Sequence, residues 1–352
     1  MRERRQIVEL FDRNDAVALA TLIHVEGSSY RRAGARLLIA SNGDYAGSIS
    51  GGCLEAEVIR KAQWMVRSGA TVQRYSTLFD DTAEIPYGLG CGGTVDVLIE
   101  PADTPEFSGL IAAMRASLQG DRRRVATQIP SAGRSLRRCI FNDSGDHLFR
   151  SSEGTVNPSL PFFDEGLDPP QRLILFGAGD DAQPIVAMAA LLGWTTLVID
   201  GRAQWARKER FPLADRVLAA SSLDGLVITA QDAVVVMTHS YEQDREWLAS
   251  VLPSHPRYLG LLGSRHRSAL LVSEVCARLG WSLENICEGI FAPVGLDIGG
   301  DGAEAIALAT VAEIQACLEG KLGTSRRMTP EAVSEQIQQG GASRYLQAQC
   351  AV

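Results

Sequence analysis

The stretch Gly177-Ala178-Gly179-Asp180-Asp181-Ala182 decides the fold of the C-terminal half of this chain. It follows the apolar run 173–176 and opens a helical pattern, so it matches the G-x-G-x-x-G/A turn of nucleotide-binding βαβ units. Asp200 lies 23 residues after Gly177, at the end of the next apolar run, where it can accept hydrogen bonds from ribose hydroxyls. The turn therefore predicts a Rossmann-type site for a phosphate-bearing ligand. The alternative is that Gly177 and Gly179 serve only a tight turn and strand–helix packing.

Strand-like and helical segments alternate beyond this turn, to about residue 319. The strand-like runs are 173–176, 196–199, 216–218, 233–237 and 258–262. Such alternation is typical of βαβ units and of a parallel sheet. We therefore predict an α/β fold in which a C-terminal Rossmann-type, doubly wound parallel sheet follows an N-terminal mixed α+β domain.

Four polar residues come directly after strands of that predicted sheet. Arg202 follows the second strand, His239 the fourth, and Ser264 and Arg265 the fifth. Ligands of doubly wound sheets bind at the carboxyl ends of the strands, so we expect these residues near the ligand. Each has a plainer alternative: Arg202 can pair with a surface carboxylate, His239 can be a helix cap or a neutral loop imidazole, and the other two can be ordinary loop residues.

The chain divides into four segments, and Pro169-Pro170 marks the clearest boundary. The segments are an N-terminal α+β domain with glycine and cysteine motifs (1–105), a variable α+β connecting segment (106–170), a Rossmann-like domain (171–320), and a C-terminal helix and tail (321–352). Within 1–118 the residue patterns predict helices over 2–12, 53–68 and 106–118 and strands over 16–25, 35–40 and 94–100. Weaker strands are expected over 124–129 and 136–141.

Composition excludes several classes of partner. The net charge of −8 and the pI near 5.3 oppose binding to a nucleic acid backbone. Seven cysteines, an odd number without a C-x-x-C pair, favour a reduced, cytoplasmic setting, and the N-terminus lacks the pattern of a signal peptide. The uncharged stretch 182–199 is interrupted by Pro184 and Gly193, so we predict no membrane span. Because the G-x-S-x-G, H-E-x-x-H and Walker A patterns are absent from the sequence, hydrolase activity is disfavoured.

Two glycine-rich motifs with cysteines stand out in the N-terminal domain. In Ser50-Gly51-Gly52-Cys53 two glycines expose backbone N–H groups at the start of a helix, which favours anions and a larger thiolate fraction at Cys53. The motif Gly88-Leu89-Gly90-Cys91-Gly92-Gly93 allows backbone to approach a ligand closely. Arg31, Arg32 and Arg36 can supply positive charge to the same site. The alternatives are a small buried residue at Cys53, a strained turn at 88–93 and a solvated arginine cluster.

Together with the turn at 177–182, these motifs resemble the xanthine dehydrogenase accessory factor (XdhC/CoxI) family. The segments that carry the resemblance are 27–36 (GSSYRRAGAR), 47–55 (GSISGGCLE), 88–93 (GLGCGG), 260–265 (GLLGSR) and 293–299 (PVGLDIG), which leads into a helix at Glu304. Two departures are Ala33, where the family often has proline, and Gly300-Asp301-Gly302-Ala303, which replaces a more usual Thr-Pro-Glu start of the helix.

The resemblance implies a cytoplasmic factor that binds the molybdenum cofactor, as molybdopterin or its cytidine dinucleotide. Such a factor supports sulfuration of the cofactor with a cysteine desulfurase and hands it to a xanthine dehydrogenase-like apoenzyme, without turnover of its own. Carried onto this sequence, the cofactor-binding residues include Ser28, Ser29, Ser50, Gly90, Cys91 and Gly92, and Cys53 is a ligand or neighbour of the molybdenum. We expect the cofactor in a cleft between the domains, with the 50–53 motif facing the turn at 177–182.

Two other functions stay open at this stage. NAD(P) is the alternative occupant of the Rossmann site, and it would make the protein an NAD(P)-dependent oxidoreductase. A clear acid–base partner for hydride transfer is missing from the sequence, and the cysteine motifs would have no part in that reaction. A thiol or nucleotide sensor is the third possibility. A homodimer is expected on the ground that symmetric dimers are common among soluble proteins.

Overall fold

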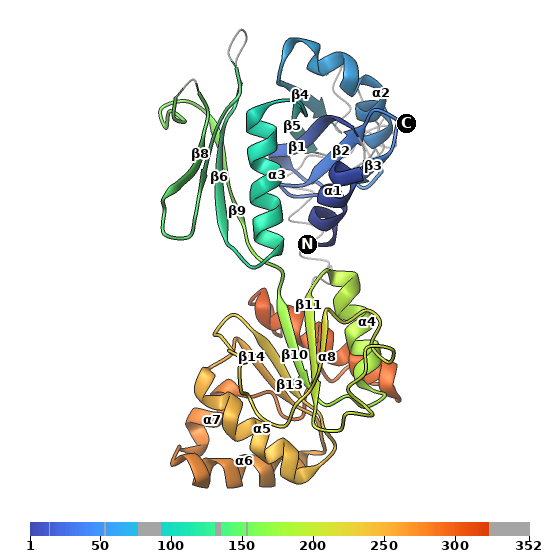
Figure 1. The fold of residues 1–352 in the computed structure, drawn as a ribbon, viewed down its shortest axis with the longest axis vertical. Coiled ribbons are helices and arrows are strands. Elements are labelled where there is room, and N and C mark those ends of the chain that lie inside the picture. The colour runs from blue at the N-terminus through green and yellow to red at the C-terminus, as the bar shows by residue number, and fades with distance from the viewer. Residues whose placement is uncertain (14, 53, 77–92, 131–134, 153, 324–352) are drawn as a thin grey trace, which may run out of the picture.

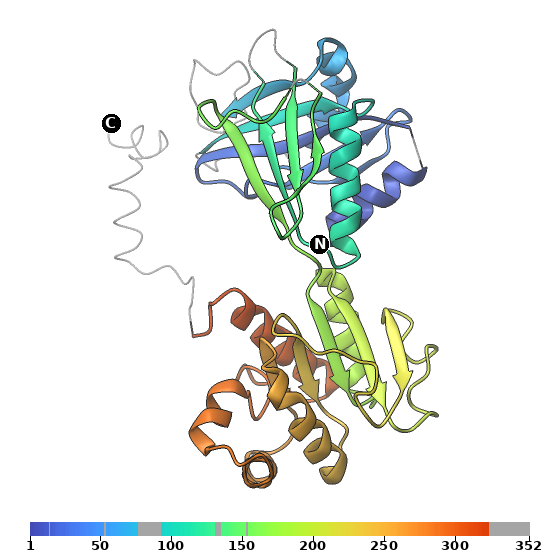
Figure 2. The same ribbon diagram turned by 60° about the vertical axis from the view of Figure 1, so that its left-hand side comes forward.

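The structure, a computed structural model, describes residues 1–13, 15–52, 54–76, 93–130, 135–152 and 154–323. Figures 1 and 2 show two parts that lie end to end, joined near residue 170. Two antiparallel sheets lie in the first part and one parallel sheet in the second. None of the helices in the described ranges has the length and apolar character needed to cross a bilayer.

The first sheet of the N-terminal part has the strand order β3-β2-β1-β5-β4 and its strands pair antiparallel. The strands are β1 (Ala16–Gly27), β2 (Arg36–Ala40), β3 (Tyr45–Gly47), β4 (Thr71–Ser76) and β5 (Gly93–Pro101). Side chains alternate between its faces: Leu19 and Leu38 pack with α1 (Arg2–Arg13), whereas Ala20 and Leu37 pack with α2 (Glu55–Met65). The predicted strands 16–25, 35–40 and 94–100 are confirmed, whereas β3 and β4 were not predicted.

The second sheet has the order β8-β7-β6-β9 and shares its core with the first. Its strands are β6 (Arg123–Gln128), β7 (Arg137–Phe141), β8 (His147–Arg150) and β9 (Phe162–Leu167). Helix α3 (Pro105–Leu118) is capped by Thr104 and buries Phe107 and Met114 in this core. A buried bidentate pair between Arg138 of β7 and Glu100 of β5 joins the two sheets, with both N···O distances at 2.9 Å.

The C-terminal sheet is parallel, in the order β12-β11-β10-β13-β14, which confirms the predicted Rossmann-type fold. Its strands are β10 (Arg172–Phe176), β11 (Thr195–Asp200), β12 (Arg216–Ala219), β13 (Ala233–Val236) and β14 (Tyr258–Leu261). Helices α4 (Ala182–Leu192) and α8 (Ala303–Leu318) cover one face. Helices α5 (Tyr241–Val251), α6 (Arg265–Leu279) and α7 (Leu283–Gly289) cover the other (Figure 2).

The Rossmann turn lies at the end of this sheet that points away from the N-terminal part (Figure 1). Gly193, at the opposite end of α4 from the turn, touches the start of α1: a Cβ on it would lie 2.4 Å from the backbone nitrogen of Arg2. Eleven helical residues separate this contact from the turn, about 16 Å at 1.5 Å per residue. The expectation that the 50–53 motif and the turn face each other across one cleft is therefore wrong. The direction of the strands explains this arrangement. The chain enters β10 at the end nearest the N-terminal part, so the turn that follows β10 lies at the far end of the sheet.

Candidate functional site

Gly177 is a glycine because the sheet is tightly packed there. Its φ is +129°, and a Cβ on it would lie 2.3 Å from the carbonyl oxygen of Met237, which follows the neighbouring strand. Any side chain would therefore collide with backbone, whatever ligand the turn binds. A Cβ on Gly179 would instead meet Oδ1 of Asp181 at 2.5 Å, so the free space above Gly179 is taken by a carboxylate of the turn itself.

Asp200 ends β11 beside the turn, as predicted, but its carboxylate is fully buried and already bonded. It accepts hydrogen bonds from the backbone nitrogen of Ala178 at 2.8 Å and from the backbone and guanidinium of Arg202 at 2.7–2.9 Å. Burial raises the pKa of Asp200, but the hydrogen bonds from Arg202 and Ala178 outweigh it, so the pKa lies below its usual value. A ribose could reach this carboxylate only by displacing Arg202, which also stacks on Trp205.

Asp181 and His239 form a second pair over the turn. Oδ2 of Asp181 lies 2.8 Å from Nε2 of His239, whose φ of +63° is rare for a residue other than glycine. Oδ1 of Asp181 is buried and has no hydrogen-bond partner within the described residues. A carboxylate in this position repels the pyrophosphate that the turn of a dinucleotide-binding protein accepts. The arrangement therefore places negative charge where a dinucleotide would put its pyrophosphate.

A cavity of about 560 Å³ adjoins this pair, and we call it the Rossmann pocket. It lies between the turn, the end of β14, the loop 293–300 and the first half of α8; among its lining residues are Asp181, His239, Gly263, Arg267, Val294 and Asp297. Ser264 caps α6 and Arg265 begins it, while Arg267 lines the pocket and pairs with the buried Asp244 at 2.6 Å. The pocket therefore carries two carboxylates against one imidazole and one arginine that is already paired.

The glycine loop before α2, residues 48–52, is organised by one carboxylate. Glu55 accepts hydrogen bonds from the backbone nitrogens of Ile49, Ser50, Gly51 and Gly52 at 2.8–3.2 Å, and from the hydroxyls of Ser48 and Ser50. The prediction that these N–H groups are free to bind an anion is therefore wrong. Burial raises the pKa of Glu55, but the hydrogen bonds, led by Ser50 and Ser48, lower it to about 2.

A second loop, residues 28–35, packs against this glycine loop. The ring of Tyr30 covers Gly51, since a Cβ on Gly51 would lie 2.6 Å from it, yet the tyrosine is 77% exposed. The carbonyl of Ser28 touches Gly93, and Ser29 is half-buried beside it in sequence. Cys53, Gly90, Cys91 and Gly92 lie outside the described residues.

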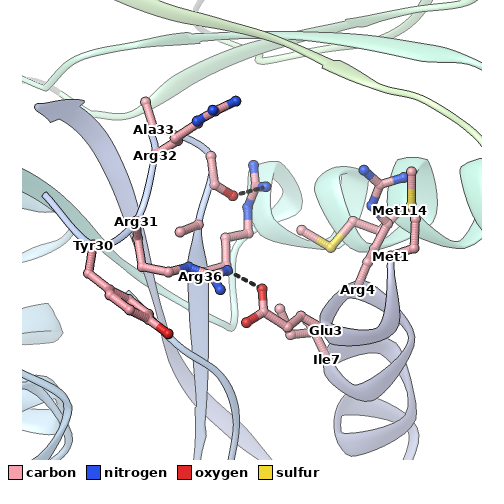
Figure 3. Close-up of a pocket in the computed structure, with 12 residues that line it drawn as sticks. Met1, Glu3, Arg4, Ile7, Tyr30, Arg31, Arg32, Ala33, Arg36 and Met114 are labelled. Carbon is pink, nitrogen blue, oxygen red and sulfur yellow. Dashed lines mark hydrogen bonds and ion pairs between the residues drawn. The ribbon is translucent and has the colours of Figure 1, made fainter. Parts of the chain in front are cut away.

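An arginine-lined cavity of about 410 Å³ lies next to Tyr30, and we call it the arginine pocket (Figure 3). One side is the loop with Tyr30, Arg31 and Arg32, and the other is α1 with Glu3 and Arg4 (Figure 3). Arg36 of β2 and Met114 of α3 also line it. Arg31 pairs with Glu3, and the buried Arg36 pairs with Glu165 of β9. The sequence suggested Arg31, Arg32 and Arg36 for such a site but gave no sign of Arg4, which only tertiary folding brings near.

Fold and sites together define a two-part protein whose Rossmann-type part follows a mixed α+β part that carries the glycine loop and the arginine pocket. The C-terminal part matches the family model of the XdhC Rossmann domain over residues 173–314. The N-terminal part matches the model of the XdhC and CoxI family over residues 10–76. The chain belongs to the XdhC and CoxI family.

Relatives span both parts of the chain. It is 31% identical over 332 residues to a probable xanthine dehydrogenase subunit of Bacillus subtilis (strain 168), covering 87% of this chain and 94% of that protein. It is 26% identical over 319 residues to the molybdenum cofactor insertion chaperone PaoD of Escherichia coli (strain K12), covering 88% and 86%. Among solved structures, a xanthine dehydrogenase from Bacillus halodurans matches with a TM-score of 0.79 and 28% identity, over 94% of this chain and 99% of that one.

Proposed function

We propose that the protein is a cytoplasmic chaperone that binds the molybdenum cofactor, supports its sulfuration and inserts it into a xanthine dehydrogenase-family apoenzyme. A cysteine desulfurase would supply the sulfur, and the chaperone itself would have no turnover. Family membership and the similarity to a molybdenum cofactor insertion chaperone support this proposal. The observation that carries it is the contact of Tyr30 with Gly51, because it places the arginine pocket beside the loop that leads to Cys53.

The residues of the N-terminal part suit such a cargo. The cofactor is an anionic pterin phosphate with a soft, sulfur-rich metal centre, so it needs positive charge and a soft ligand. Arg31 and Arg32 offer the charge, and Cys53 is proposed as ligand or neighbour of the molybdenum. Ser28, Ser29, Ser50 and the motif 90–92 stay proposed contacts. The backbone of the glycine loop does not supply anion-binding groups, because Glu55 already accepts its hydrogen bonds.

The Rossmann pocket supports this reading over an NAD(P)-dependent oxidoreductase. Asp181 fills the space above Gly179, and Asp200 is saturated by Ala178 and Arg202. To bind here, a dinucleotide would have to displace Asp181 to place its pyrophosphate, and it would have to displace Arg202 from Asp200 to place its ribose. We therefore propose that the Rossmann part does not hold NAD(P) as a redox cofactor in this chain.

The deciding experiment is anaerobic purification from a host that makes the cofactor, followed by molybdenum analysis and pterin fluorescence after oxidation. The wild-type protein should carry both in near-equal amounts, and Cys53→Ala should lose most of them while it unfolds at the same temperature. Cys287→Ala removes an exposed thiol of α7 and is the matched control. Traces of metal and pterin in the wild type, together with tight NAD binding, would overturn the proposal. Light scattering of the same samples tests whether the protein is the homodimer expected from the sequence.

A further inference from the structure

The arginine pocket carries more positive charge than its carboxylates neutralise. Arg31 and Arg36 each have one acidic partner, Glu3 and Glu165. The Arg4 guanidinium bonds only to neutral oxygens among the described residues, the hydroxyl of Ser117 at 2.8 Å and the carbonyl of Asp168 at 2.6 Å. The exposed side chain of Arg32 forms no hydrogen bond or ion pair with any described residue. Two of the four arginines, Arg4 and Arg32, therefore line a shared cavity without an ion-pair partner among the described residues, although the carboxylates of Glu165 and Asp168 lie near enough to attract the charge of Arg4.

The pKa of Arg4 and the unpartnered nitrogen of Arg36 both reflect how close these arginines lie to one another. Burial and then the positive charge of Arg36 lower the pKa of Arg4 to about 10. Nε of Arg36 is buried and has no partner within the described residues, although its other nitrogens bond to Gly34 and Glu165. Like charges held this close repel each other, and an anion bound between them removes that repulsion. The pocket is thus built for a negative group.

We propose that the arginine pocket is a phosphate-binding site, which holds a phosphate or diphosphate group of the ligand between Arg4, Arg31 and Arg32. Its volume of about 410 Å³ is within the range of small-molecule sites and exceeds what one phosphate needs. Arginine suits this ligand because its planar guanidinium can donate two parallel hydrogen bonds to phosphate oxygens. That the phosphate belongs to the molybdenum cofactor rests on the function proposed above.

The two glycine-containing loops are poorer candidates for the same group. Glu55 uses the backbone N–H groups of residues 49–52, and Asp181 covers Gly179 in the Rossmann turn. By contrast, the guanidinium of Arg32 forms no ion pair with a carboxylate in the described part of the chain. Tyr30 lines the pocket and covers Gly51, so a ligand anchored in the pocket by its phosphate lies beside the glycine loop.

The site is tested by titrating the purified full-length protein with inorganic phosphate and pyrophosphate in a calorimeter. Wild type should bind pyrophosphate more tightly than phosphate, and the affinity should fall as salt rises. Arg32→Ala should weaken pyrophosphate binding about tenfold and Arg32→Glu further, without a change in unfolding temperature, because the Arg32 side chain bonds to no other described residue. Arg124→Ala is the control for charge, since Arg124 pairs with Asp164 on the exposed surface of β6. Equal affinity in Arg32→Ala, Arg32→Glu and wild type would overturn the site.

A second variant and a second measurement separate this inference from the proposed function. Arg4→Met keeps the packing of the side-chain stem and removes the charge; like Arg32→Ala it should lower both pyrophosphate affinity and the retained phosphopterin. Retention of the cofactor at wild-type levels in both variants would overturn its assignment to this pocket while the proposed function stands. Arginine-dependent pyrophosphate binding in a wild-type protein that never carries cofactor would support the site and reject the function.

Discussion

The arginine pocket and the Rossmann pocket have opposite electrostatic character, although each adjoins a glycine-containing loop of the kind that binds anions in other proteins. The arginine pocket exposes two arginines without acidic partners among the described residues, whereas the Rossmann pocket contains Asp181 and Asp297 and its arginine is already paired. In both places a carboxylate of the chain itself lies at or beside the start of the helix that follows the glycines and occupies the loop, Glu55 in one and Asp181 in the other. A glycine pattern therefore marks where backbone is exposed, and the neighbouring side chains decide what it binds.

The largest effect is expected at Gly177, where a substitution tests whether packing or ligand binding requires a glycine in the Rossmann turn. Gly177→Ala should destabilise the protein by roughly 3 kcal/mol or more, because the new Cβ meets the carbonyl of Met237 at 2.3 Å and φ is +129°. Gly201→Ala is the matched control: its Cβ meets nothing closer than 3.6 Å, so a change within about 0.5 kcal/mol is expected. Urea unfolding measures both. Equal stability of the two variants would contradict the packing explanation for Gly177 and would leave close approach of a ligand as the reason for a glycine there.

The second prediction concerns Glu55, the carboxylate at the start of α2 that accepts the hydrogen bonds of the glycine loop. Glu55→Gln should cost on the order of 2 kcal/mol, because six donors lose an ionised acceptor and at least two of them then face an amide NH2 group. Glu57→Gln, which removes a single pair with Lys61 on the same helix, should cost less. Urea unfolding again provides the measurement.

The same residue makes a prediction about pH. The pKa of Glu55 is about 2 in the folded protein, below the ordinary 4.5, so its stabilisation is complete above pH 4.5. It is lost as pH falls from about 4.5 towards 2, and in this window the stability of wild type and Glu55→Gln should converge. A constant difference between the two proteins across the window would show that Glu55 does not hold the loop as an ionised group.

The fourth prediction concerns the negative charge in the Rossmann pocket. Asp181→Ala removes the charge above Gly179 and should raise the affinity for NAD at least tenfold, about 1.4 kcal/mol, since the turn then presents an uncovered helix start. Asp224→Ala, an exposed change of equal charge in the same part, should leave the affinity unaltered. The measurement is calorimetry with NAD. An unchanged affinity in Asp181→Ala would mean that another feature, such as the buried Asp200, excludes the dinucleotide.

The fold of the C-terminal part could be predicted because its signal is local. Buried parallel strands are continuous apolar runs such as 173–176, and the glycine turn marks where the first one ends. Strands β4 and β9 could not be predicted in this way because each carries polar or charged residues and forms an edge of its sheet. The residues that pair with each of these strands lie 18 or more positions away in sequence, so a local pattern cannot predict the pairing.

The candidate site was only partly predictable for a similar reason. Arg31 and Arg32 are adjacent and noticeable, but Arg4 joins them only because α1 packs across β2 and β3. The role of Glu55 had a local signal that was overlooked: an acidic residue three positions after Gly52, at a helix start, can accept backbone N–H groups as in a capping box. The position of Asp181 over the Rossmann turn could also have been anticipated from the sequence, since an acidic residue within a phosphate-binding motif repels the phosphate.

The smallest expected effect tests whether the arginine pocket and the glycine loop act as one site. Tyr30 is 77% exposed and touches both, so Tyr30→Ala should change stability by no more than about 0.5 kcal/mol. It should nevertheless lower the retained cofactor about two- to fivefold, because the ring no longer orders the two loops against each other and binding must then supply that ordering. Tyr45→Ala, at a tyrosine that is 58% exposed on β3, is the control for loss of an exposed ring. Equal retention in both variants, with pyrophosphate binding intact, would show that the pocket and the loop bind independently, and the phosphate site would then have to be assigned without reference to Cys53.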